Sequence, residues 1–112
     1  MTSCSVAIVN PLGLHARAAA RFVHLASGFA SSIRVGRNGR EMDGKSIMGL
    51  LLLSASQGTT VMISADGTDE HEALAALRGL VERGLDETAV EALAHDKPFD
   101  SPGRTGLAQD KP

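Results

Sequence analysis

The sequence Asn10-Pro11-Leu12-Gly13-Leu14-His15-Ala16-Arg17 marks the point where a predicted strand ends and an alanine-rich helix begins. Its histidine stands at the start of that helix, two residues before an arginine. The first turn of a helix has backbone N–H groups without intrahelical partners, and the helix dipole is positive there, so both favour an anion. An imidazole nitrogen that can bond phosphorus beside such an anion site predicts a phosphohistidine at His15.

A strand and an amphipathic helix are predicted on either side of this histidine. Residues 3–9 alternate apolar and polar side chains, as a half-buried strand does. Residues 16–27 carry apolar side chains at helical spacing, and we expect these to face the core: Ala19, Phe22, Val23 and Ala26. Gly28 follows at the position where a left-handed residue commonly ends a helix.

A hairpin and a second helix are predicted next. Asn38-Gly39 is a preferred two-residue turn between antiparallel strands, which would here cover residues 32–37 and 40–43. Ser46 is a predicted N-cap for a helix over residues 47–53, of which Ile47 and Leu50 to Leu53 can supply a core face.

The remaining elements complete a mixed architecture. Residues 59–65 alternate apolar and polar side chains, which predicts a strand. Thr68 is expected to cap a helix that has acidic residues in its first turn and ends near Gly84. Residues 86–95 can form one more helix, and residues 96–112 have the composition of a disordered tail. Because no chain of long parallel βαβ units is present, an antiparallel sheet with helices on one face fits this order best.

The composition argues against several classes of function. The 112 residues include three Phe, no Trp and no Tyr, and the formal net charge is −2, so we expect no nucleic-acid partner. The single Cys4 cannot form an internal disulfide, and no Cys–His cluster has metal-site spacing, so we expect neither a cofactor nor a metal. No apolar run could cross a bilayer and no signal-like segment opens the chain, which predicts a cytoplasmic protein without membrane insertion.

Two separated motifs then identify a family. Residues 13–19, Gly-Leu-His-Ala-Arg-Ala-Ala, and residues 45–49, Lys-Ser-Ile-Met-Gly, resemble HPr, the phosphocarrier of the bacterial phosphoenolpyruvate-dependent phosphotransferase system. The likeness spans residues 3–86. It implies an α+β open-faced β-sandwich, in which a four-stranded antiparallel sheet carries three helices on one face in the order βαββαβα. We therefore expect an HPr-like domain over residues 1–87 and a C-terminal extension over residues 88–112.

The resemblance also implies a function. His15 would accept a phosphoryl group on its Nδ1 atom from phosphorylated Enzyme I and pass it to an EIIA-type protein or domain. Arg17 would stabilise the phosphate, because a guanidinium matches phosphate oxygens, although a solvated arginine is the simpler interpretation of the residue alone. The chain would be a monomeric carrier and not an enzyme. At position 18 this sequence has alanine, where many members of the family have proline. In this respect the sequence resembles nitrogen-related or alphaproteobacterial-type members.

Ser46 has two interpretations. As a serine before a helix it is a candidate N-cap, and by resemblance it is the regulatory serine that HPr kinase/phosphorylase modifies in many members. A partner surface is expected beside His15, and its residues are Ala20, Arg21, Ile47, Met48 and Leu51. For Arg21 and His24, a solvated face of the helix is the simpler alternative.

Other functions stay open at this point. One alternative is a regulatory binding module of a nitrogen-related phosphotransfer branch, controlled by phosphorylation of His15 and Ser46. Another is an unrelated α+β domain that binds an anion reversibly at the helix start. Whether sugar transport or nitrogen regulation is served does not follow from the residues.

Overall fold

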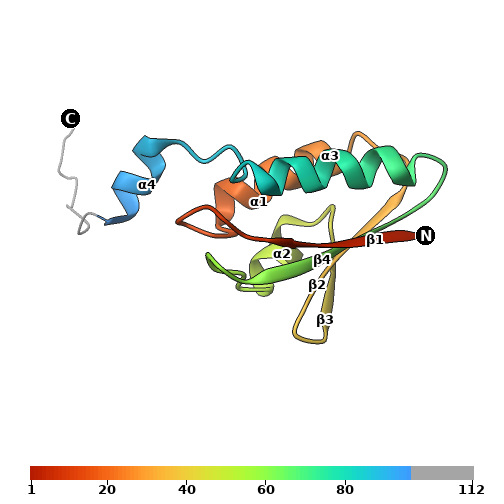
Figure 1. The fold of residues 1–112 in the computed structure, drawn as a ribbon, viewed down its shortest axis with the longest axis horizontal. Helices are drawn as coiled ribbons and strands as arrows, with labels where there is room; N and C mark the ends of the chain where they lie inside the picture. The colour runs from red at the N-terminus through yellow and green to blue at the C-terminus, as the bar shows by residue number, and fades with distance from the viewer. Residues whose placement is uncertain (97–112) are drawn as a thin grey trace.

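The computed structural model describes residues 1–96 and contains four strands and four helices within them (Figure 1). Along the chain these are β1 (Thr2–Ala7), α1 (Ala16–Ala26), β2 (Ser32–Arg37), β3 (Arg40–Asp43), α2 (Ile47–Leu52), β4 (Thr60–Asp66), α3 (Glu70–Glu82) and α4 (Ala89–Asp96). The strands form one sheet in the order β1-β4-β2-β3, and every neighbouring pair is antiparallel. This is the predicted α+β open-faced sandwich, with α4 as an additional helix.

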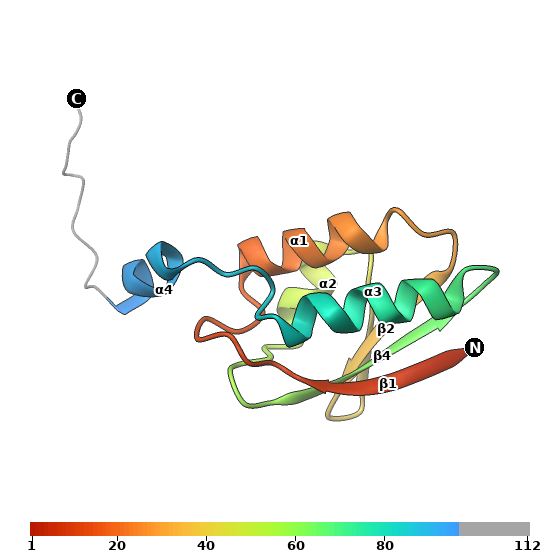
Figure 2. The ribbon, with the colours of Figure 1, turned by 45° about the horizontal axis from the view of Figure 1, so that its top comes forward.

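The core lies between the sheet and the helices. Helices α1 and α3 lie side by side over one face of the sheet, and α2 packs against α1 (Figures 1 and 2). The strands supply the buried side chains of Val6, Ile33, Val35, Val61 and Ile63, the residue after β1 supplies Ile8, and the helices supply Phe22, Leu50 and Leu77. Burial of each such side chain stabilises the fold by about 1.5–3 kcal/mol, which holds the short helix α2 in place without strong intrinsic propensity.

Several local predictions are confirmed. The hairpin between β2 and β3 turns at Asn38 and Gly39, which have φ angles of 52° and 79°. The Ser46 hydroxyl accepts a hydrogen bond from the Gly49 N–H at 3.1 Å, so Ser46 is the N-cap of α2. Gly84, with a φ of 81°, follows the end of α3.

Three local predictions are wrong. Gly28 is not left-handed, and α1 ends through an ordinary right-handed Ser27. Thr68 does not cap α3, because Asp69 takes the N-cap position and uses its carboxylate to bind the loop before β2, at the N–H groups of Ala30 and Ser31. Of the residues expected on the core face of α2, Ile47 and Leu52 do not join the core and are 41% and 51% exposed. For Asp69, tertiary hydrogen bonds to the chain before β2 replaced the local cap that propensity favours.

The chain after α3 turns away from the body before α4 begins (Figure 1). Leu85 and Asp86 have φ angles of 56° and 53°, which is why this helix starts at Ala89 and not at residue 86. Thr88 and Glu91 then form a reciprocal capping box, with N–H to side-chain oxygen distances of 2.9 and 3.1 Å. The predicted tail over residues 96–112 lies, from residue 97 on, outside the described residues.

Candidate functional site

The loop between β1 and α1 is fixed to the body by backbone hydrogen bonds. The Leu14 N–H donates to the Ala55 carbonyl at 2.8 Å, and the Gly13 N–H donates to the Asn10 carbonyl at 3.1 Å. Gly13 has a φ of 67°, and a Cβ at that position would lie 2.6 Å from the Ala55 oxygen. The loop therefore needs glycine here both for its left-handed backbone and for its close approach to the segment after α2.

His15 occupies the N-cap position of α1. Its backbone is extended, with φ −82° and ψ 179°, and its carbonyl accepts from the Ala19 N–H at 2.8 Å. The side chain makes no capping hydrogen bond and is 23% exposed. Because the imidazole does not cap the helix, it is available to carry an anion at the positive end of α1.

A buried carboxylate, that of Glu87, faces one nitrogen of this ring. Glu87 Oε1 lies 3.8 Å from His15 Nε2, and the Glu87 side chain is only 3% exposed. The same oxygen accepts from Asn10 Nδ2 at 2.8 Å and from the Leu12 N–H at 3.1 Å, which fixes its position. His15 Nε2 is itself buried and has no hydrogen-bond partner among the described residues. Nε2 is thus covered by the protein.

A second carboxylate, that of Glu91 in α4, meets the arginines of α1. Glu91 Oε1 accepts from Arg21 Nη2 at 3.0 Å, and Glu91 Oε2 lies 3.6 Å from Arg17 Nη1. Arg21 Nη1 also donates to the Leu85 carbonyl at 3.2 Å. Hydrogen bonds from the Thr88 N–H and from Arg21 lower the pKa of Glu91 to about 2. The expectation of a solvated Arg21 is therefore wrong, whereas Arg17 is 74% exposed and His24 is exposed.

The predicted partner surface lies on α1 and α2, which pack against each other. Ile47 and Met48 are 41% and 66% exposed, and Ala20 is exposed as well. Leu51 is partly buried against the core. Two adjacent helices therefore present an apolar area, to which Leu52 adds a side chain that the pattern had assigned to the core.

Comparisons with known proteins agree with this geometry. A family model described as "PTS HPr component phosphorylation site" matches residues 2–83. The chain belongs to the HPr family. "Phosphocarrier protein HPr" of Cupriavidus necator is 51% identical over 74 residues, which cover 66% of this chain and 83% of that protein. It follows that this chain is a phosphocarrier of the phosphotransferase system.

Solved structures of HPr share the fold. The crystal structure of HPr-C-His from Thermoanaerobacter tengcongensis superposes with a TM-score of 0.75 at 45% identity, over 79% of this chain and 99% of that one. A crystal structure of an HPr dimer from the same organism has a TM-score of 0.62 at 46% identity, over 78% of this chain and all of that one. HPr proteins thus include a dimeric form, and the expectation of a monomer stays a prediction.

Three residues of this HPr site escaped prediction, namely Asn10, Glu87 and Glu91. Glu87 and Glu91 lie more than seventy residues after His15, and a carboxylate in an acidic chain carries no signal of its own. Asn10 lies in the loop before His15, but its role depends on its hydrogen bond to the distant Glu87. The Thr-x-x-Glu spacing of Thr88 and Glu91 is a recognisable helix-start pattern, however, and it would have placed the start of α4 correctly.

Among residues 1–96, no group of three His, Cys, Asp or Glu side chains could hold a metal ion. None of the helices there has the length and apolar character needed to cross a bilayer.

Proposed function

We propose that His15 accepts a phosphoryl group on Nδ1 from phosphorylated Enzyme I and passes it to an EIIA-type protein or domain. The observation that carries this proposal is the orientation of the ring at the start of α1, with Nε2 covered and turned to Glu87. Residues 1–87 form the carrier domain in this proposal, because the Glu87 side chain completes the site. The named curated relative is a phosphocarrier, which supports the transfer over a regulatory module alone.

The transfer requires a lone pair on Nδ1 and a proton on Nε2. The Nδ1 lone pair attacks phosphorus in line, the N–P bond forms, and the bond to the donor breaks with its electron pair going to the donor. The ring gains positive charge during attack, and the Glu87 carboxylate 3.8 Å from Nε2 stabilises that charge and the tautomer. Glu87 is therefore a positioning residue, and Glu87→Gln should lower the phosphorylation rate by up to about tenfold.

The incoming negative charge meets Arg17 and the first backbone N–H groups of α1. Each helix-terminus contact of this type contributes about 0.3–1 kcal/mol, and up to ~2 kcal/mol where the geometry is partly buried. This modest scale suits a carrier, because each further 1.36 kcal/mol or so of phosphoryl binding would slow its release about tenfold. In this proposal the chain is itself the temporary acceptor of the phosphoryl group, which makes it a carrier.

Incubation with phosphoenolpyruvate and Enzyme I, followed by intact-mass measurement, tests this function. We expect an acid-labile gain of one phosphoryl group that His15→Ala abolishes. His24→Ala is the matched control, because it removes an exposed histidine of the same helix. A gain that survives in His15→Ala, or that disappears in His24→Ala, would refute the assignment of the acceptor.

Ser46 is proposed as a second, regulatory phosphorylation site. Its hydroxyl caps α2 next to the exposed Ile47 and Met48, so a phosphate there would add negative charge to the docking area. Such charge would repel an acidic surface of Enzyme I. HPr kinase/phosphorylase with ATP should place one phosphate on the peptide that contains Ser46, and an unmodified peptide would remove this part of the proposal.

A further inference from the structure

Helix α4 delivers Glu91 to the two arginines that the proposed function assigns to the phosphoryl group and to the partner. The Glu91 side chain is 5% exposed and contacts Arg21 at 3.0 Å and Arg17 at 3.6 Å. The family match ends at residue 83, so this contact belongs to the extension and not to the shared domain. An internal carboxylate therefore already occupies the cationic face of α1.

The attachment of α4 depends on this carboxylate more than on apolar burial. Val90 and Leu93 are 74% and 58% exposed, so the larger apolar side chains of the helix do not anchor it. A helix of eight residues is marginal by itself in water, and its N-terminal capping box only sets where it begins. Loss of the Glu91 contact should consequently release α4 while leaving the rest of the fold intact.

One oxygen of the Glu91 carboxylate lacks a hydrogen-bond donor among the described residues. Glu91 Oε2 is buried and has no hydrogen-bond partner among the described residues, since Arg17 Nη1 stays beyond hydrogen-bond distance. A buried carboxylate oxygen without a donor is a cost, which weakens the net binding of α4. A phosphoryl group, with three acceptor oxygens and nearly two negative charges, would compete well for Arg17 from His15 two residues away.

We propose that α4 is an internal competitor for the Arg17–Arg21 face of α1, which Glu91 occupies in the unphosphorylated carrier. Phosphorylation of His15, or the approach of an acidic partner surface such as that expected for Enzyme I, displaces Glu91 and frees α4. The inference rests on the proposed function for its partner and on the Glu91 contacts for its mechanism. It assigns to the extension the task of weakening the docking of the empty carrier.

The test uses the full chain with Glu91→Gln, which keeps a side chain compatible with the capping box but removes the charge. Glu82→Gln is the matched control, because Glu82 lies on α3, is 53% exposed and pairs with Arg78. Phosphorylation by phosphorylated Enzyme I should show a KM about three- to tenfold lower in Glu91→Gln, with kcat nearly unchanged. Glu82→Gln should behave as wild type. An unchanged or higher KM in Glu91→Gln would overturn the proposal.

Amide exchange supplies a readout that does not need Enzyme I. The Ala92 N–H donates to the Thr88 carbonyl at 3.1 Å and reports whether α4 is formed and held. We expect faster exchange of this amide in unphosphorylated Glu91→Gln, and in wild type after phosphorylation. Unchanged exchange in the variant would show that Glu91 does not hold α4. If Enzyme I fails to phosphorylate His15 at all, the proposed function fails, and the exchange comparison still judges the Glu91 contact.

Discussion

Gly13→Ala should damage both the stability of the fold and the presentation of His15, and Gly39→Ala separates the two causes. Both glycines are left-handed, with φ angles of +67° and +79°. A Cβ at Gly39 would meet nothing within 4 Å, whereas one at Gly13 would lie 2.6 Å from the Ala55 oxygen and 2.9 Å from Ser56 Cα. Both obstructing atoms belong to the backbone, so a side-chain rotation cannot relieve the clash.

The expected magnitudes follow from these contacts. A left-handed alanine costs roughly 1–2 kcal/mol, and this is the whole expected loss for Gly39→Ala. Gly13→Ala adds an overpacking cost of about 1–3 kcal/mol, because the loop and the segment after α2 must move apart. The Ala55 carbonyl that obstructs the new Cβ also accepts the Leu14 N–H at 2.8 Å, so the displacement reaches the residue before His15.

Urea unfolding and phosphorylation kinetics together measure this prediction. With a slope of about 1–3 kcal/mol per molar urea, the extra cost should separate the two midpoints by roughly 1 M. Phosphorylation by Enzyme I should slow at least about tenfold in Gly13→Ala, since displacements near 1 Å can cost a hundredfold. It should stay at the wild-type rate in Gly39→Ala. Equal midpoints and equal rates in the two variants would refute the account of the loop.

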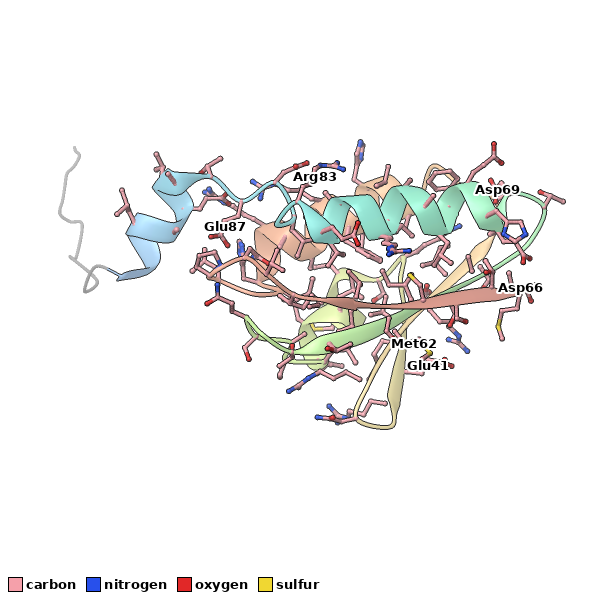
Figure 3. The ribbon with its side chains drawn as sticks, in the orientation of Figure 1. Glu41, Met62, Asp66, Asp69, Arg83 and Glu87 are labelled. Carbon is pink, nitrogen blue, oxygen red and sulfur yellow. The ribbon has the colours of Figure 1, made fainter. Side chains whose placement is uncertain are left out.

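Three further perturbations test the helices of the site. Ser46→Ala should lower the free energy of unfolding by about 0.5–2 kcal/mol while Ser46→Asp retains the cap, as paired urea titrations would show; equal losses would contradict capping. The double substitution Ile47→Ser with Met48→Ser should raise the KM for Enzyme I with little change in stability. Met62 is 50% exposed on the far face of the sheet (Figure 3), so Met62→Ser is the control and should leave the KM unchanged. Equal KM values for the two variants would argue against the apolar docking area. The folded pKa of Glu91, about 2, lies below its ordinary 4.5, so the α4 contact is fully present above pH 4.5 and is lost as the pH falls toward 2. Chemical shifts of α4 that do not change over this range would contradict the contact.

The fold could be predicted from the sequence because its local signals agree with one another. Asn38-Gly39 fixed the hairpin, Ser46 fixed the start of α2, and alternation placed Val6 and Ile8 inside. The errors arose where a distant partner outweighed a local preference. Asp69 stands at the N-cap position of α3, but its carboxylate binds the chain before β2 and does not cap the helix. This contact joins residues 38 positions apart, which a local sequence pattern does not reveal.

The site could be predicted only for the residues that a motif contains. His15, Arg17 and Ser46 lie in short contiguous patterns, so their places at helix starts were accessible. Glu87 and Glu91 follow α3 in the sequence, and their contacts with His15 and Arg21 depend on the left-handed turn at Leu85 and Asp86. The geometry of that turn is a tertiary outcome, since leucine rarely adopts a positive φ.

Hydrogen-bond satisfaction distinguishes Asp69, which holds two parts of the fold together, from Glu91 beside the proposed site. Asp69, at the end of the molecule away from Glu87 (Figure 3), accepts from the N–H groups of Ala30 and Ser31 and from the Ser31 hydroxyl. These bonds lower the pKa of Asp69, and the bond from the Ser31 hydroxyl has the largest effect. Asp69 thereby ties the start of α3 to the chain before β2. At the other end, buried polar atoms stay without hydrogen-bond partners among residues 1–96: Asn10 Oδ1, His15 Nε2 and Glu91 Oε2. A fold optimised only for stability would pair them. One of them is the imidazole nitrogen itself, and the other two belong to residues that contact Glu87 or the arginines of α1. Polar atoms are thus left without partners where the proposed transfer brings and removes a charged group.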